Sequence, residues 1–168
     1  MKEIRFLVGN IGTGKTTYAR EKVKEECAIV VSFDAILASL SVNETFDFDL
    51  RRYDVMKGMF LEGIARWVNI EHGLLIIDNT NISRKTRIRL INEIKKIIKE
   101  SEEFIKLKKE EIKLTAVDFG GGDKKSLERR LLKPRNTSRE KWIETHEKFK
   151  SSYEMANLDE GFSVVTIL

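Results

Sequence analysis

The chain has 168 residues, which is enough for one domain with its own hydrophobic core. Charged residues make up 35% of the chain, its formal net charge is +4, and the single cysteine, Cys27, has no partner for an internal disulfide. No apolar run approaches the roughly 18 residues of a membrane span, and no leader pattern opens the chain. We therefore expect a soluble cytoplasmic protein with no membrane contact, a buried Cys27, and a mild preference for anionic partners.

Short apolar runs alternate with helical patterns from one end of the chain to the other. Five strands are expected at residues 4–8, 28–31, 74–80, 112–119 and 162–168, the first two of them buried. The helices expected between them cover residues 15–26, 34–40, 50–72, a stretch from Ser83 to beyond Ile98, 123–132 and a stretch from about 137. This alternation predicts a single α/β domain over residues 1–168, with a mostly parallel five-stranded sheet and helices on both faces.

The helical segments carry start signals and apolar stripes. Ser83 is placed to cap one helix, and residues 137–140 (TSRE) have the spacing of a capping box. In the long helix, the residues expected to face inward are Val55, Met59, Ile64 and Val68. A later stripe, which we interpret as packing rather than catalysis, contains Trp142, His146, Phe149 and Tyr153.

The stretch GNIGTGKTT (9–17) fits the phosphate-loop pattern of a glycine, four residues, and Gly-Lys-Ser/Thr. Glycines let the backbone curl so that several N–H groups point at one anion, and the following helix adds its positive dipole end. Lys15 would reach the outer phosphates of a nucleotide, and Thr16 would ligate Mg²⁺. The expected nucleotide-binding residues of the loop are Gly9, Gly12, Thr13, Gly14, Lys15, Thr16 and Thr17. A plain strand-to-helix turn is the alternative, but it would need neither the lysine nor the hydroxyl.

Two aspartates follow predicted strands. Asp78 ends the apolar run LLII, where it could hold the Mg²⁺ water shell or serve only as a strand-end cap. Asp34 follows the run at 28–31. The carboxyl ends of parallel strands line one crevice, so Asp34 should lie near the phosphate loop and could accept the proton of an attacking hydroxyl. The alternative for Asp34 is a helix N-cap.

A basic segment near the C-terminus predicts a mobile lid at about residues 123–153. Arginines there could clamp the transferring phosphoryl group. Arg129 and Arg130 are adjacent and point in different directions on a helix, so only one of them should reach the site. With no guanine-reading motif in the chain, these features suit a small kinase better than a GTPase.

Over nearly its full length, the chain resembles the kinase module of phage and bacterial polynucleotide 5′-hydroxyl kinases. The resemblance runs from IRFLVGNIGTGKTTYARE through VVSFD and LLIIDNTNIS to LERR and GFSVVTIL. It implies a phosphate-loop kinase fold, nucleotide and metal binding by Lys15 and Thr16, Asp34 as general base, and Arg130 as a lid arginine on the phosphates.

Two positions depart from that family. Its acceptor-binding arginine, three residues after the base, is Leu37 here, and Arg51 or Arg52 is the candidate to replace it. Its second lid arginine falls on Pro134, and Arg135 is our choice for that role.

The resulting expectation is transfer of the γ-phosphate of ATP (or GTP), with Mg²⁺, to the 5′-hydroxyl end of RNA or DNA. The catalytic residues would be Lys15, Asp34 and Arg130, and the metal residues Thr16 and Asp78. A repair phosphatase or ligase would be a possible partner. Two alternatives stay open: a kinase of a small-molecule hydroxyl (nucleoside, sugar or nucleotide sugar), and a nucleotide-dependent binding module without acceptor chemistry.

Overall fold

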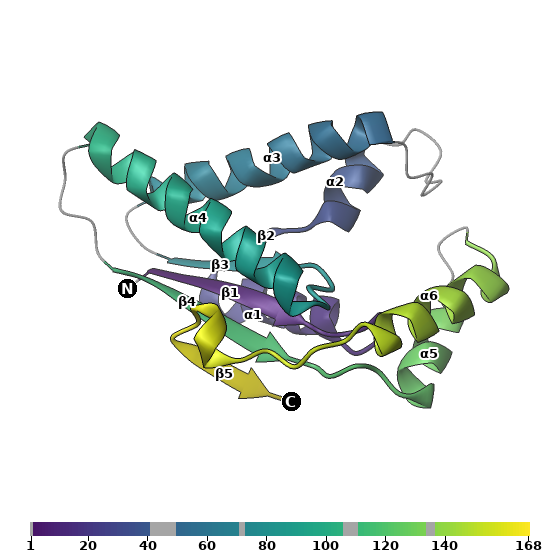
Figure 1. Cartoon of the computed structure of the whole chain (residues 1–168). Helices are drawn as coiled ribbons and strands as arrows, with labels where there is room; N and C mark the ends of the chain where they lie inside the picture. Colours follow the sequence, from purple (N-terminus) through teal and green to yellow (C-terminus); the bar gives the residue numbers. More distant parts are fainter. Residues whose placement is uncertain (1, 41–49, 71–72, 106–110, 134–136) are drawn as a thin grey trace.

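The computed structural model describes residues 2–40, 50–70, 73–105, 111–133 and 137–168, with side chains at 50–52 and 102–105 excluded. A five-stranded sheet lies at the centre of the molecule (Figure 1). Its strands are β1 (Lys2–Val8), β2 (Ile29–Val31), β3 (Gly73–Asp78), β4 (Ile112–Asp118) and β5 (Val164–Ile167). All neighbouring strands pair in parallel, in the order β2-β3-β1-β4-β5. The predicted α/β fold is therefore confirmed.

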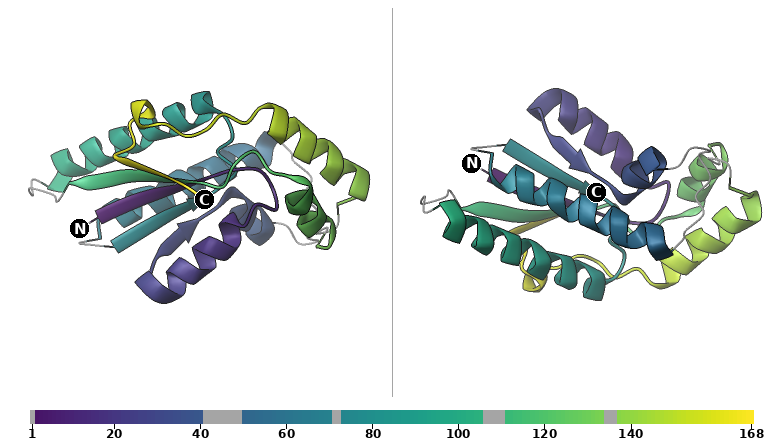
Figure 2. Two further views of the ribbon diagram at one scale, coloured as in Figure 1. Left: turned by 90° about the horizontal axis from the view of Figure 1, so that it is seen from below. Right: turned by 90° about the horizontal axis from the view of Figure 1, so that it is seen from above.

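Helices cover both faces of this sheet, and two more project beyond its carboxyl edge. They are α1 (Lys15–Glu26), α2 (Phe33–Leu40), α3 (Leu50–Val68), α4 (Arg84–Ile105), α5 (Lys124–Leu131) and α6 (Arg139–Ser151), with a short 3₁₀ helix, η1 (Leu158–Glu160). The α3 and α4 helices lie on one face and α1 on the other, as the two views of Figure 2 show. The α5 and α6 helices extend past the strand ends.

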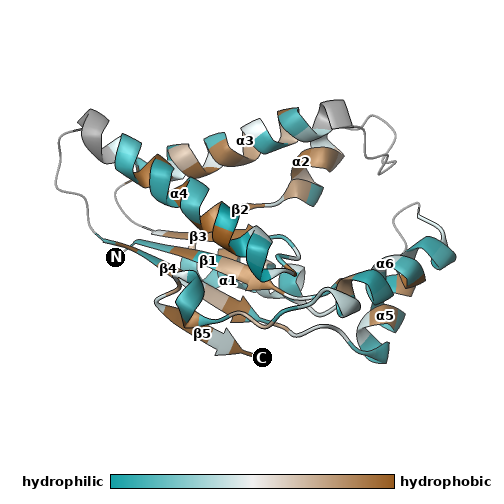
Figure 3. Cartoon of the chain, viewed as in Figure 1, coloured by the Kyte–Doolittle hydropathy of each residue, from teal (hydrophilic) through white to brown (hydrophobic). Residues whose placement is uncertain are grey.

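Alternation along the central strand creates two cores. From β1, Ile4, Phe6 and Val8 face α3 and α4, whereas Leu7 faces α1. Figure 3 shows the apolar residues gathered on the sheet and on the inner sides of the helices, with polar residues on α5 and α6. Among the described helices, none combines the length and apolarity that a membrane crossing requires.

The register brings the carboxyl ends of three strands to one edge. Leu7 pairs with Asp78 of β3, and Val8 pairs with Asp118 of β4. Because the strands are parallel, the loops that follow β1, β3 and β4 all leave from this edge. The phosphate loop and Asp78 therefore meet by topology alone.

Some expectations about burial were wrong. The strand at 28–31 was expected to be buried, but β2 is an edge strand and Ile29 is 45% exposed. Cys27 is exposed, because it is the C-cap of α1 in the left-handed region (φ +50°) rather than part of the strand. On α3, Val55 and Met59 face solvent, and the core face is rotated by one residue to Met56 and Phe60, joined by Ile64 and Val68 as expected.

One of the two predicted helix N-caps is confirmed, and the other lies one residue later than expected. Ser83 caps α4, since its Oγ accepts the N–H of Thr86 at 3.3 Å, as predicted. The capping box expected at 137–140 is wrong: Ser138 is the N-cap of α6, and its side chain accepts the N–H of Lys141. Tyr153 lies beyond the end of α6, where its hydroxyl donates to Asp118 at 3.0 Å, so it does not continue the helical stripe.

Candidate active site

The loop between β1 and α1 is held by backbone bonds to the loops after β3 and β4. The N–H of Gly9 donates to the carbonyl of Thr80 at 2.9 Å, and the N–H of Asn10 donates to the carbonyl of Gly120 at 3.1 Å. The buried Asn10 side chain bonds further, donating to the carbonyls of Gly121 and His146 and accepting the N–H of Ile11. The path of this loop is thus set by three strand ends together.

At two positions within the loop, the backbone conformation favours glycine over a residue with a side chain. Gly12 has φ +75°, and a Cβ there would lie 2.0 Å from the carbonyl oxygen of Ser126, so α5 packs directly on the loop. Gly14 has φ +110° and is the N-cap of α1 without a capping side chain. The first turn of α1 contains no acidic residue. Its N–H groups therefore point at a place suited to an external anion, as the predicted phosphate loop requires.

Lys15 lies inside the curl of this loop. It is only 7% exposed, and its Nζ donates to the carbonyl of Gly9 at 2.8 Å and to that of Asn10. Burial, together with the positive charge of Arg130, lowers the pKa of Lys15 to about 8. The carboxylates of Asp78, Asp34 and Asp118 oppose that shift, in this order of strength. The charged residues that the sequence selected for catalysis are therefore gathered within electrostatic range of one ammonium group.

The two candidate aspartates belong to different elements, one to a strand and the other to a helix. Asp78 is the last residue of β3 and is half-buried at the sheet edge. Asp34 is exposed in the first turn of α2. Since α2 begins at Phe33, and Ser32 accepts the N–H of Ile36, Asp34 is not the N-cap of this helix. The alternative that Asp34 caps this helix is therefore excluded.

The start of α2 is fastened by a residue that the sequence analysis did not select. The Oδ1 of Asn79 accepts the N–H of Phe33 at 2.9 Å, which ties the neighbour of Asp34 to the neighbour of Asp78. The Phe33 ring stacks on Phe60, with centroids 4.6 Å apart and planes 9° apart. The signal in the sequence was the pair of amides in DNTN directly after a strand, because amides there can bond to free backbone groups.

Of the two adjacent arginines of α5, Arg130 is the one whose charge acts on Lys15. Arg130 is half-buried, and its guanidinium lies 4.7 Å from the ring centroid of Trp142. Arg129 is exposed, and its Nε donates back to the carbonyl of Lys125 at 3.3 Å. Leu37 is buried and cannot contact an acceptor. Pro134, Arg135 and the side chains of Arg51 and Arg52 lie outside the described residues.

The sequence pattern of a known family, described as an AAA domain, matches residues 4–97, which is more than half of the chain. The chain belongs to this AAA-domain family. The match spans β1 to most of α4, and so contains the phosphate loop and both candidate aspartates. In a search of curated proteins, nothing matches this AAA-domain chain.

Solved structures share the whole fold of this AAA-domain protein. It is similar to a fungal RNA kinase (16% identity, 99% of this chain and 75% of that chain covered, TM-score 0.68). It is also similar to Chaetomium thermophilum Kti12 in complex with ADP-AlF3 (19%, 98% and 88%, 0.63) and to a gluconokinase from Sinorhizobium meliloti 1021 (12%, 99% and 81%, 0.51). At these identities the likeness shows the phosphate-loop kinase fold and leaves the acceptor open.

The residues expected to hold Mg²⁺ in this AAA-domain protein offer oxygen donors. Thr16 is exposed at the start of α1, and Asp78 is half-buried at the end of β3. No group of three or more metal-binding side chains occurs in the part of the chain that the structure describes. Mg²⁺ in nucleotide sites needs only one or two protein oxygens, because phosphates and waters supply the rest. The residues present therefore fit a nucleotide-bound Mg²⁺.

His146 has a structural role, as predicted from its place in an apolar stripe. It is 1% exposed, and its Nε2 lies 3.0 Å from the Oγ of Ser126, which belongs to the capping box of α5. Its backbone carbonyl accepts the Asn10 amide. His146 thus contacts both α5 and the phosphate loop from α6.

Two buried acidic residues support the site from behind. Asp118 is fully buried, and accepts the N–H groups of Gly120 and Ala156 and the hydroxyl of Tyr153. Glu160 forms a two-pronged ion pair at 2.6 and 2.7 Å with Arg87, which is itself 0% exposed. Arg87 also donates to the carbonyls of Asn81 and Ile82, so the pair fixes the loop between Asp78 and α4. Sequence reasoning missed both groups, because their long-range partners lie 35 to 73 positions away.

Proposed function

We propose that this protein transfers the γ-phosphate of ATP (or GTP) to the 5′-hydroxyl end of RNA or DNA, with Mg²⁺. The observation that carries the proposal is the convergence on Lys15 of two catalytic candidates, Asp34 and Arg130, together with the metal candidate Asp78. A nucleotide switch needs the phosphate loop and the metal residues, but it has no use for an exposed carboxylate opposite them.

In this proposal, each side chain has one task. Lys15 and the N–H groups at the start of α1 hold the outer phosphates of the nucleotide. Thr16 and Asp78 hold Mg²⁺, which supplies positive charge to the phosphate oxygens. Asp34 orients the acceptor hydroxyl and accepts its proton, and Arg130 offsets the charge that develops on the transferring group.

The two helices beyond the sheet edge would act as the lid. We propose that α5 and α6, within residues 123–153, close over the phosphates as part of a single domain at 1–168. Arg130 would then move with α5, and Gly12 is the position where α5 rests on the phosphate loop. Arg135 stays a candidate for a second lid contact.

A polynucleotide acceptor is favoured by the resemblance of the site motifs to end-healing kinases and by the shared fold with an RNA kinase. The second candidate is a small-molecule acceptor. It is favoured by the buried Leu37, which removes one expected phosphate contact, and by the shared fold with a gluconokinase. A repair phosphatase or ligase would be the partner only in the first case.

The deciding experiment is transfer of radiolabelled γ-phosphate, with Mg²⁺, to 5′-hydroxyl RNA and DNA oligomers and to a panel of nucleosides and sugars. Label on the oligomers, abolished in Asp34→Ala, supports the proposal. Label only on a metabolite favours the second candidate. Slow hydrolysis with no labelled acceptor favours a binding module.

A further inference from the structure

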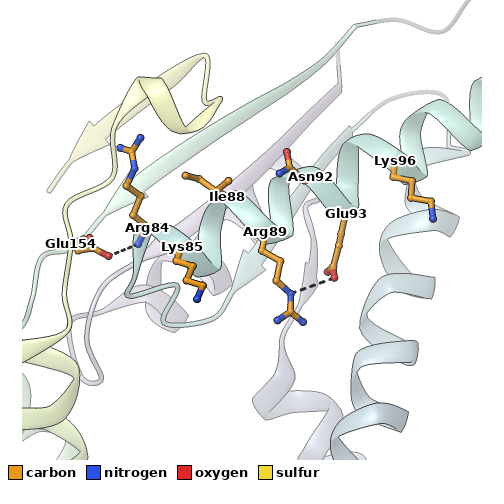
Figure 4. A pocket seen from close by; sticks show the side chains of 8 residues that line it. All are labelled: Arg84, Lys85, Ile88, Arg89, Asn92, Glu93, Lys96 and Glu154. Atoms are coloured by element: carbon orange, nitrogen blue, oxygen red, sulfur yellow. Dashed lines mark hydrogen bonds and ion pairs between the residues drawn. The ribbon is translucent and has the colours of Figure 1, made fainter.

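An open groove of about 780 Å³ runs along the outward face of α4, and no described residue of the phosphate loop lines it. Its charged lining residues are four cations and two carboxylates, so the groove has a net positive charge. Figure 4 shows the lining side chains: Arg84, Lys85, Ile88, Arg89, Asn92, Glu93, Lys96 and Glu154.

Three of these cations form what we call the basic stripe: Lys85, Arg89 and Lys96. In Figure 4 they extend to the same side of α4. They are exposed and spaced four and seven residues apart, which places them on one helix face. At 1.5 Å per residue, the stripe is about 16 Å long. Charges spread over that length suit an extended anion rather than a single phosphate group.

The carboxylates nearby compensate this charge only in part. Glu93 lies 2.8 Å from Lys57 of α3 and 3.6 Å from Arg89, so one carboxylate faces two cations. Lys96 is 76% exposed and lies 3.6 Å from Glu100, and such exposed pairs contribute little stability. Among the described residues, Lys85 has no ion-pair partner. Phosphates could therefore replace these contacts at low cost.

The stripe begins where the phosphate loop and the lid meet. Residues 79–83 join Asp78 to α4, and within them Thr80 accepts the N–H of Gly9. On the lid side, Glu154 follows α6 and accepts the N–H of Arg84 at 2.8 Å. The Arg84 guanidinium is already held by Asp159 at 2.7 and 3.0 Å. Glu154 therefore occupies the N-terminus of α4, and Asp159 occupies the Arg84 guanidinium. The basic stripe is the part of this helix left to bind an anion that extends out of the candidate active site.

We propose that the basic stripe binds the sugar-phosphate backbone of the single-stranded acceptor, a few nucleotides beyond its 5′ end. This inference rests on the proposed polynucleotide kinase function. Long, exposed lysine and arginine side chains contact phosphates without reading bases, so the stripe would favour longer acceptors irrespective of their sequence. It would add affinity for the strand and would leave the chemistry at Asp34 unchanged.

The test compares the double variant Lys85→Ala/Arg89→Ala with a matched control, Arg20→Ala/Lys24→Ala. The control removes an exposed arginine and lysine at the same four-residue spacing from α1, on the opposite face of the sheet. The acceptors are a 5′-hydroxyl 12-mer and a nucleoside 3′-monophosphate. The measured quantity is the ratio of kcat/KM for the 12-mer to kcat/KM for the mononucleotide.

We expect this ratio to fall about tenfold in the stripe variant and to stay within about twofold of the parent in the control. The salt dependence of 12-mer binding should also weaken, by about 0.7 in the logarithmic slope for each phosphate that the variant no longer neutralises. If the parent labels the 12-mer and the ratio is unchanged in the stripe variant, or falls equally in the control, the stripe does not bind the strand. If the parent labels no oligonucleotide at all, the proposed function itself fails.

Discussion

The nucleotide side of the candidate site consists of buried, backbone-bonded groups, whereas the acceptor side consists of exposed side chains. On the nucleotide side, Gly9 and Asn10 are bonded to the loops after two other strands, and Lys15 is buried among carbonyl oxygens. On the acceptor side, Asp34 is exposed on α2, whose start is held through Asn79 and a ring stack. The basic stripe is likewise entirely on the surface.

This difference shows which half of the site can change. The loop path depends on backbone bonds among β1, β3 and β4, so altering it disturbs the centre of the sheet. Surface side chains on α2 and α4 can be replaced without touching either core. One scaffold can therefore keep its nucleotide chemistry while its acceptor varies, which agrees with the shared fold of an RNA kinase and a gluconokinase.

The largest expected effects come from substitutions that distinguish the nucleotide side of the site from the acceptor side. Lys15→Ala should lower both nucleotide affinity and phosphoryl transfer, because it removes the charge within the loop. Asp34→Ala should lower transfer by at least about 10³-fold while nucleotide affinity stays within a fewfold of the parent. Calorimetric titration with ATP, alongside turnover of labelled ATP, measures both. Near-normal turnover in Asp34→Ala would show that this carboxylate is not the base.

The buried lysine predicts a pH dependence of stability for the nucleotide-free protein. The pKa of Lys15 is lowered to about 8 in the folded state, so between pH 8 and 10.5 the unfolded chain binds more protons. Stability should therefore rise with pH across this window, relative to Lys15→Met, by up to about 3 kcal/mol. Parallel curves for the two proteins in urea denaturation from pH 7 to 10.5 would exclude a lowered pKa.

The rigidity of the nucleotide side can be tested with two glycines of the loop. Gly12→Ala should destabilise the protein by about 3 kcal/mol, because its Cβ would meet the Ser126 carbonyl at 2.0 Å in a strained backbone conformation. Gly14→Ala has the strain but no neighbour within 4 Å, so about 1 kcal/mol is expected. Chemical denaturation of both variants gives the difference. Equal losses would mean that α5 does not rest on the loop.

The smallest expected effect concerns the fastening of the acceptor side. Asn79→Ala removes the acceptor for the Phe33 N–H, and should lower kcat about tenfold with little change in KM for ATP, as a loss of orientation does. Asn79→Asp keeps an oxygen that can accept this bond, and should recover most of the activity. A rise in KM for ATP with unchanged kcat would assign Asn79 to the nucleotide side instead.

Local sequence patterns predicted the features that depend on residues close together in the chain, such as where helices begin and end. The bounds of α1 follow from the phosphate-loop motif, and the start of α4 follows from Ser83. Burial was less predictable: Val55 and Met59 had helical spacing, but the face that packs is set by the sheet below it. Cys27 looked like a buried apolar residue, yet it caps a helix on the surface.

The sequence by itself determined the alternation of strands and helices, the phosphate loop and the identity of the charged candidates, because these depend on periodicity and short spacing. Tertiary structure alone decided that Asn79 fastens the start of α2 and that Arg87 pairs with Glu160. These pairings join residues far apart in the chain. The strand order determines which residues meet, and burial requires those that are polar to be paired, because an unpaired buried polar group costs free energy. No local sequence pattern contains that information.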